Sequence, residues 1–144
     1  MPMKTRRTYS VEFPFGRSGN NPSANTTYYL GFKPGANFST TAGDQRVYAI
    51  RPGRIVRCLL LMQSTAVTTN ESWTWSIRKN NTTNYTILAI ATTQAEKVFY
   101  NTTMNVPMTW GDYFELVTTT PNPWVTPPVN CQGYWMVTFE EGVS

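Results

Sequence analysis

The sequence predicts an all-β fold, an antiparallel jelly-roll-like β-sandwich with an extended N-terminal arm. Threonine and asparagine are abundant, whereas leucine, lysine, glutamate and alanine are sparse for a helical protein, and this bias favours strands and turns. Short apolar segments recur about every ten residues with turn residues between them, a spacing typical of sandwiches and barrels. A chain of 144 residues is long enough for one domain with a substantial core.

Residues 1–26 are predicted to be a flexible, basic arm, and residues 27–144 the sandwich domain. The stretch GRSGNNPSANTT is rich in Gly, Asn and Ser and lacks apolar periodicity, as expected of a linker. Ahead of it, RTYSVEFPF alternates like a single strand, and its proline suits an edge position. The apolar face of this strand has to dock on its own domain, on a sister subunit or on a partner. That face carries Tyr9, Val11 and Phe13.

The sandwich domain contains a series of short strand candidates separated by Gly, Pro, Asn and Asp. They are residues 26–32, 46–50, 54–64, 71–80, 85–91, 97–100, 104–108, 111–120 and 134–141. Because strand side chains alternate between two faces, three of these segments predict which residues share a face. Trp73, Trp75 and Ile77 share one face, as do Phe114 and Leu116, and also Trp135, Val137 and Phe139.

The strand over residues 54–64 differs from the others because both of its faces are apolar. One face carries Val56, Cys58, Leu60 and Met62, and the other carries Ile55, Leu59 and Leu61. Such a strand needs a second covering layer, and the chain offers no helix for it. Either a sister subunit or the folded-back arm can supply that layer. We expect a sister subunit and assign the face of Val56, Cys58, Leu60 and Met62 to the interface, although the choice between the two faces stays open.

The residue inventory argues against an enzyme and against a metal or cofactor. The chain has no histidine and only two cysteines, which removes histidine-based catalysis and the usual zinc sites. Asp112 and Glu115 fall on opposite faces of one strand, so they do not form the carboxylate pair of a glycosidase. Asp112 in WGDYF is interpreted as a turn residue that opens this strand. Cys58 and Cys131 are expected to be buried thiols, and pairing between them stays open.

Charge is distributed unevenly along the chain. Residues 1–57 contain nine basic and two acidic residues, and residues 58–144 contain three basic and six acidic ones. Arg57 shares a face with the apolar Ile55 and Leu59, so it is expected to be partly covered and paired, for example with Glu140 or Glu141. The aromatic residues alternate as core residues do, and they do not line a basic groove, so nucleic acid is not the expected partner. No apolar run is long enough to span a membrane, and no secretory signal is recognised.

Four segments together resemble a known family. They are YAIRPGRIVRCLLLMQS, WTWSIRKN, TWGDYFELV and YWMVTFEE, in that order. Over residues 28–141 their order and spacing are similar to those of the trimeric jelly-roll (tumour-necrosis-factor-like) domains of bacteriophage virions.

This resemblance implies a capsid decoration (cement) protein, made in the host cytoplasm and bound as homotrimers to the outer capsid surface, where it stabilises the shell. The arm would dock on the major capsid protein through Tyr9, Val11 and Phe13, with Arg6 and Arg7 paired to capsid carboxylates. The alternative is the receptor-binding, carbohydrate-binding head of a phage tail or capsid fibre. In that case Trp124 or Tyr134 would stack on sugars.

Overall fold

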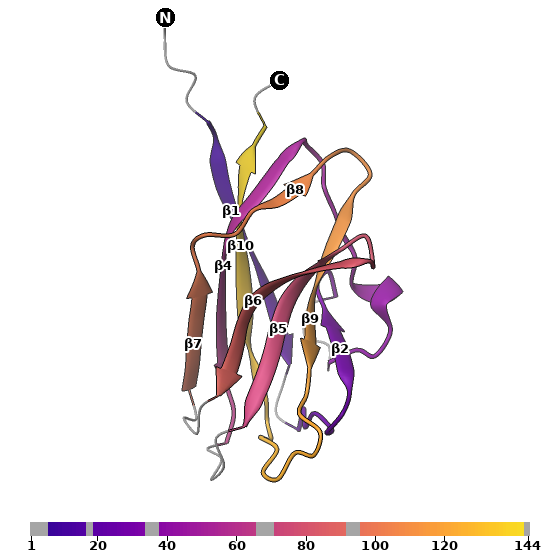
Figure 1. The fold of residues 1–144 in the computed structure, drawn as a ribbon, viewed down its shortest axis with the longest axis vertical. Helices are drawn as coiled ribbons and strands as arrows, with labels where there is room; N and C mark the ends of the chain where they lie inside the picture. Colours follow the sequence, from indigo (N-terminus) through magenta and orange to yellow (C-terminus); the bar gives the residue numbers. More distant parts are fainter. Residues whose placement is uncertain (1–5, 17–18, 34–37, 66–70, 92–95, 143–144) are drawn as a thin grey trace, which may run out of the picture.

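The protein is a sandwich of two antiparallel β-sheets (Figure 1), which confirms the predicted all-β class. The computed structural model describes residues 6–16, 19–33, 38–65, 71–91 and 96–142. Sheet A has the order β1 (Thr8–Gly16), β10 (Gln132–Glu141), β4 (Gly53–Gln63) and β7 (Glu96–Asn101), and β8 (Val106–Met108) also pairs with β4. Sheet B has the order β2 (Thr27–Leu30), β9 (Tyr113–Thr119), β5 (Ser72–Lys79) and β6 (Thr83–Ala91), and β3 (Val47–Tyr48) also pairs with β9. One 3-10 turn, η1 (Ala42–Gln45), precedes β3.

The core lies between the two sheets and follows the predicted alternation. Trp75 and Ile77 of β5 and Trp135 of β10 are completely buried. The other members of the three predicted faces are also buried, namely Trp73, Phe114, Leu116, Val137 and Phe139. The large aromatic rings of both sheets meet between the sheets in one continuous cluster.

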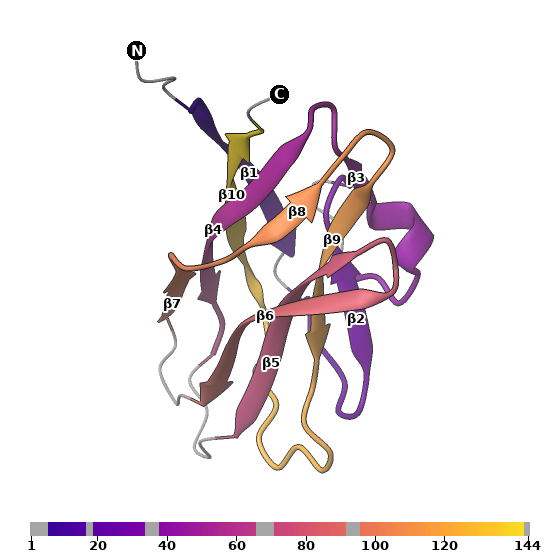
Figure 2. The same cartoon turned by 45° about the horizontal axis from the view of Figure 1, so that its top comes forward.

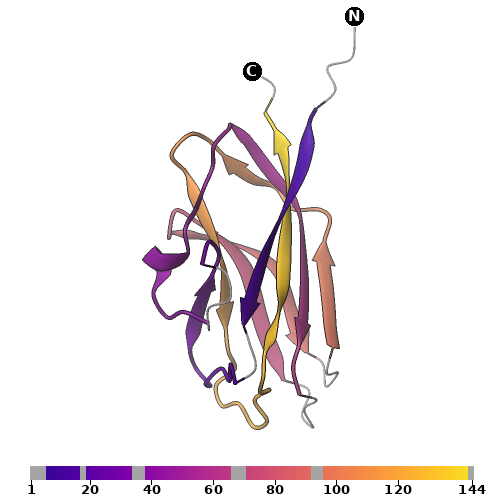
Figure 3. The same ribbon diagram turned by 180° about the vertical axis from the view of Figure 1, so that it is seen from behind.

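Part of the predicted arm is a strand of sheet A, so the free-arm prediction is wrong. β1 pairs with β10 along its whole length, from Thr8 opposite Glu140 to Gly16 opposite Gln132, and Figure 3 shows the two strands side by side. The Phe13 ring stacks on Trp135 with 4.6 Å between ring centroids. The apolar side chains of β1 therefore dock on their own domain, and the domain begins at β1. The proline of this segment lies on an edge strand, as predicted.

The segment that follows β1, which the sequence suggests is a flexible linker, is held in its described part by Asn20. This side chain is buried, and its amide donates to the carbonyl of Cys131 at 3.0 Å. In return, the backbone N–H of Cys131 donates to the carbonyl of Asn20 at 2.9 Å. Asn20 thus ties this segment to the start of β10.

Replacement of Phe13 by alanine is expected to lower the free energy of unfolding by about 2 kcal/mol, because a half-buried aromatic ring is lost from the core edge. The measurement is urea denaturation followed by tryptophan fluorescence, which reports on Trp135 beneath the ring. Val11→Ala is the matched control, since Val11 lies on the same strand but is 40% exposed. Equal stability of Phe13→Ala and the parent protein would mean that β1 is not docked in solution.

Candidate functional site

An apolar surface covers the outer face of sheet A. Two rows of neighbouring side chains cross β10, β4 and β7. In one row Leu59 lies between Met136 and Tyr100, and in the other Leu61 lies between Tyr134 and Val98. Leu59, Leu61, Tyr134 and Met136 are half-buried, whereas Val98 is 49% and Tyr100 69% exposed. We call these six residues the outer patch.

The outer patch corrects the predicted subunit interface. Cys58, Leu60 and Met62 are buried between the two sheets of their own chain, so a partner cannot contact them in this fold. Only Val56 of the predicted interface is partly accessible. On β4 the side chains available to a partner are mainly Leu59 and Leu61, which belong to the opposite face.

A β-bulge explains why simple alternation fails at the start of β4. In the β4–β10 ladder Thr138 pairs with Arg57, but the next residue, Phe139, pairs with Ile55. Val56 is thus the extra residue, and the two faces of β4 exchange at this point. Ile55 consequently enters the core with Cys58, although strict alternation predicts opposite faces for them.

Arg57 is exposed, so the expectation that it is partly covered is wrong. Other arginines pair with the C-terminal glutamates. Glu140 accepts from Arg6 and Arg54, and Glu141 accepts from Arg51.

A second apolar feature, which we call the edge groove, lies where the open edges of the two sheets face each other, between β1 and β3. It is a hollow of about 190 Å³, and its lining includes the predicted arm residues Tyr9, Val11 and Phe13. Across from them lie Tyr48 and Ile50, which are 56% and 64% exposed. The structure thus brings the three predicted arm residues together as one wall of a groove in their own domain. The sequence gives no local sign of this groove, because its walls are distant in the chain.

The two aromatic residues considered for carbohydrate binding lie in different places. Trp124 is half-buried in the loop before β10, and its ring packs edge-on against Trp73 at 5.1 Å between ring centroids. Tyr134 belongs to the outer patch. Trp110, in the turn between β8 and β9, is a more exposed ring at 68%. These rings do not form one stacking surface.

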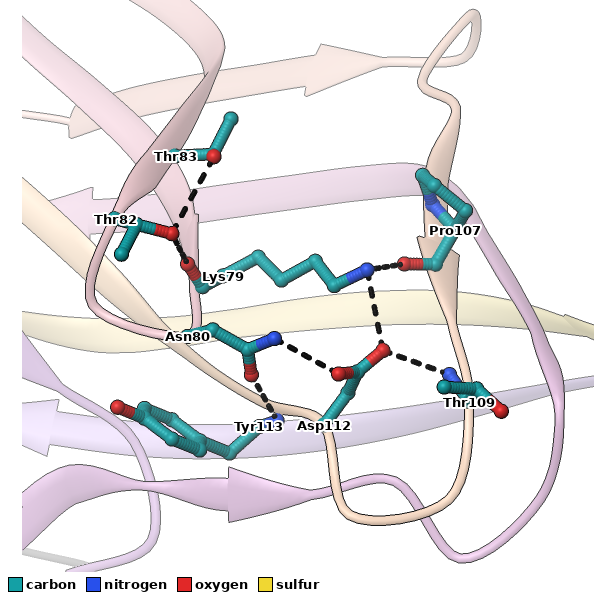
Figure 4. Close-up of polar contacts among 8 residues, drawn as sticks. All are labelled: Lys79, Asn80, Thr82, Thr83, Pro107, Thr109, Asp112 and Tyr113. Atoms are coloured by element: carbon teal, nitrogen blue, oxygen red, sulfur yellow. Dashed lines mark hydrogen bonds and ion pairs between the residues drawn. The ribbon is translucent and has the colours of Figure 1, made fainter.

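Asp112 organises a turn, as the sequence predicts (Figure 4). Its carboxylate accepts from the side-chain amide of Asn80 at 2.8 Å and from the backbone N–H of Thr109 at 2.9 Å. It also lies 3.1 Å from the ammonium group of Lys79. These contacts join the β5–β6 turn to the start of β9. They hold the pKa of Asp112 below its usual value, with the hydrogen bond from Asn80 as the largest cause.

Replacement of Asp112 by asparagine is expected to lower the free energy of unfolding by about 2 kcal/mol at neutral pH, because charge-assisted hydrogen bonds are lost. Since the folded-state pKa is depressed, this contribution is present above the ordinary value of 3.8 and is lost as the pH falls through the folded-state pKa. Urea denaturation at pH 7 and at about pH 3 measures the difference. If the unfolding free energies of Asp112→Asn and the parent protein differ by the same amount at both pH values, the ionised carboxylate is not the cause of the difference.

Glu115 is a buried acid, and the sequence pattern does not predict its burial. It lies opposite Arg78 in the β5–β9 ladder and is completely buried. Neither of its carboxylate oxygens has a hydrogen-bond partner among the described residues, and the same is true of Nε of Arg46 and Arg78. The guanidinium of Arg46 instead lies over the ring of Tyr113, 4.4 Å from its centroid. Burial raises the pKa of Glu115, and the charges of Arg46 and Arg78 oppose that shift.

Replacement of Glu115 by glutamine is therefore expected to change the pH dependence of stability. Because the folded-state pKa lies above the ordinary 4.5, the folded parent protein loses stability as the pH rises from that value through the folded-state pKa. Relative to the parent protein, Glu115→Gln should gain stability between about pH 4.5 and pH 7 in urea denaturation. Glu12→Gln is the matched control because Glu12 is exposed on β1. An offset between Glu115→Gln and the parent protein that does not vary with pH would contradict the expectation.

The remaining chemistry is sparse in the described part of the chain. Cys58 and Cys131 are both buried and do not form a disulfide, and burial raises the pKa of Cys58 to about 12. The described residues contain no cluster of acidic or cysteine side chains suited to a metal ion. Within the same residues there is no helix long and apolar enough to cross a membrane.

Comparisons of this chain with protein-family models, with curated proteins and with solved structures gave no match.

Proposed function

We propose that this protein is a structural component of a virus particle, a capsid decoration protein that assembles as homotrimers on the outer surface of the shell. The observation that carries the proposal is the outer patch. An exposed apolar face in the middle of a sheet is typical of a protein–protein interface, and its centre, Leu59 and Leu61, is flanked by the aromatic rings of Tyr100 and Tyr134.

A second copy of the same chain is the proposed occupant of the outer patch. The edge groove exposes Val11, Tyr48 and Ile50, which are apolar side chains of the same kind as those of the patch. A contact between the groove of one copy and the patch of the next uses two different surfaces, and such contacts generate a ring when the rotation from one copy to the next closes. The number three comes from the sequence resemblance to trimeric jelly-roll domains.

The strand order supports the jelly-roll part of the proposal. The first and last strands, β1 and β10, are neighbours in sheet A, and the chain changes sheet between β4 and β5, between β6 and β7, and again on either side of β9. Crossings of this kind are characteristic of Greek-key and jelly-roll sandwiches. In such a role the protein stabilises the shell by repeated non-covalent contacts and not by chemistry.

The structure changes how shell binding is proposed. Tyr9, Val11 and Phe13 already belong to β1 and its pairing with β10, so they do not form a free arm that reaches the major capsid protein. We therefore place the contact with the shell on another part of the surface. The alternative, a carbohydrate-binding fibre head, has less support because Trp124 packs against Trp73.

The experiment that tests the proposal is light scattering of the full-length protein on a sizing column. Three chains of 16.3 kDa give about 49 kDa, which is the expected mass, and a stable monomer of about 16 kDa would overturn the trimer. Quantitative mass spectrometry of purified particles then separates the two viral roles. Many copies on each particle indicate decoration, whereas a few trimers indicate a fibre head.

A further inference from the structure

The end of the sandwich where β1 begins and β10 ends (Figure 2) collects arginines from separate parts of the sequence. Arg6 precedes β1, whereas Arg51 and Arg54 lie on either side of the turn that leads into β4. Glu140 and Glu141, at the end of β10, lie between them. We call these five residues the arginine end.

The arginine end contains more guanidinium groups than carboxylates. Nη1 of Arg6 and Nη2 of Arg54 donate to the same oxygen of Glu140, Oε1, at 2.7 and 2.9 Å. Arg51 pairs with Glu141. Three guanidinium groups thus share two carboxylates, and one positive charge is left over. The exposed Arg7, whose carbonyl accepts from the backbone N–H of Glu141 at 2.9 Å, adds another.

The arginine end also contains space for an acidic side chain. A hollow of about 330 Å³ is lined by Arg6, Arg54, Glu140 and Glu141, together with Pro107 and the backbone of Gly53 and Gly142. The arginines keep large parts of their side chains in solvent, with 53% exposed for Arg6, 54% for Arg51 and 40% for Arg54. Their guanidinium groups can therefore form new hydrogen bonds without unfolding of the strands that carry them.

We propose that the arginine end is a binding site for carboxylate side chains of a partner protein. A guanidinium group matches a carboxylate in geometry and charge. One incoming carboxylate can pair with Arg6 while Arg54 stays paired with Glu140. Every charged group of the arginine end then has one partner. Glu140 and Glu141 disfavour a nucleic acid in the same place, because closely spaced phosphates would lie against both carboxylates.

This inference rests on the proposed function for the identity of the partner. In a decoration protein, the arginine end is the surface that faces the capsid, and the carboxylates belong to the shell. It replaces the predicted arm with a site on the folded domain, and it keeps Arg6 and Arg7 in the predicted role of pairing with capsid carboxylates. The outer patch, on the face of sheet A, remains available for a second copy.

The test is a calorimetric titration of the full-length protein with hexaglutamate, repeated with hexaglutamine and with a thymidine hexanucleotide. Hexaglutamate is expected to bind, with an affinity that falls as salt rises from about 0.05 to about 0.3 M. Arg6→Gln should weaken this binding about three- to fivefold, the effect of one exposed ion pair. Arg51→Gln should also weaken it, because Glu141 then loses its partner and repels the incoming carboxylate. Lys33→Gln is the matched control. It also removes one positive charge, but from an exposed pair with Asp44 in another part of the fold.

Three outcomes would overturn the carboxylate site. They are no binding of hexaglutamate to the parent protein, equal weakening by Lys33→Gln, and tighter binding of the hexanucleotide. Light scattering of the same samples separates this result from the proposed function. A monomer that binds hexaglutamate through Arg6 and Arg51 would overturn the trimer alone, and a trimer that does not bind it would overturn the carboxylate site alone.

Discussion

Replacement of Trp135 by alanine is expected to lower the free energy of unfolding by about 3–5 kcal/mol, the cost of deleting a large buried aromatic side chain. Trp135 is completely buried in the middle of β10. Its ring stacks on Phe13 of β1 and meets Phe114 of β9 edge-on at 6.2 Å between ring centroids. The substitution therefore weakens the contact between the two sheets and the docking of the edge strand at once. Urea denaturation, followed by circular dichroism, measures the loss.

Trp135→Phe is the conservative control for this prediction. It keeps an aromatic ring in the same place, and the indole N–H of Trp135 has no hydrogen-bond partner among the described residues, so no hydrogen bond is expected to be lost. We expect a cost of about 1 kcal/mol for the smaller ring. A loss below about 1 kcal/mol for Trp135→Ala would show that this part of the core is not packed in solution as it is in the structure.

Replacement of Leu61 by glutamate is expected to convert the proposed trimer to a monomer. Leu61 lies at the centre of one row of the outer patch, between Tyr134 and Val98, where a second copy would bury an unpaired carboxylate. Burial of such a charge costs several kcal/mol, so the dissociation constant should rise at least about 100-fold. Because Leu61 is only half-buried within its own chain, the sandwich itself should remain folded. Light scattering measures the mass, and circular dichroism checks the fold.

The matched control for Leu61→Glu is Val125→Glu. It introduces the same side chain at an apolar residue that is 68% exposed but lies in the loop before β10, away from the outer patch. We expect this variant to retain the mass of the parent protein. If Leu61→Glu also retains a mass of about 49 kDa, which is three times 16.3 kDa, the outer patch is not the subunit interface.

Local alternation in the sequence was enough to group the core residues of several strands. In β5 it places Trp73, Trp75 and Ile77 on one face, and all three are buried. The grouping of Trp135 with Val137 in β10 holds in the same way, since both are buried. These predictions succeed because the side-chain period of a strand depends only on local backbone geometry.

The pairing of distant strands was not readable from the sequence. The bulge at Val56 depends on the register between β4 and β10, and no residue near Val56 specifies that register. For the same reason, the apolar face of β1 was recognised, but its docking partner Trp135 was not. The excess of positive charge in residues 1–57 could be counted in the sequence. Its position next to Glu140 could not be predicted, because β1 and β10 are far apart in the chain.

The buried acid in β9 shows a different limit. Glu115 shares an outer face with Tyr113, where a solvated side chain is the ordinary expectation. Its burial arises beside two arginines from other elements, Arg46 before β3 and Arg78 on β5. An alternation pattern describes one strand at a time, so it contains no information about which charged residues of other elements lie beside Glu115.

The neighbouring positions of β1 and β10 in sheet A also constrain how the chain folds during synthesis. Thr8 pairs with Glu140, so β1 leaves the ribosome long before β10, the strand with which it pairs. Contacts between such distant residues form slowly, because a very long loop has to close first. Until then, the aromatic face of Tyr9 and Phe13 is open to solvent and to other nascent chains. β1 is thus synthesised before the other strands of sheet A but cannot pair until β10 has been made.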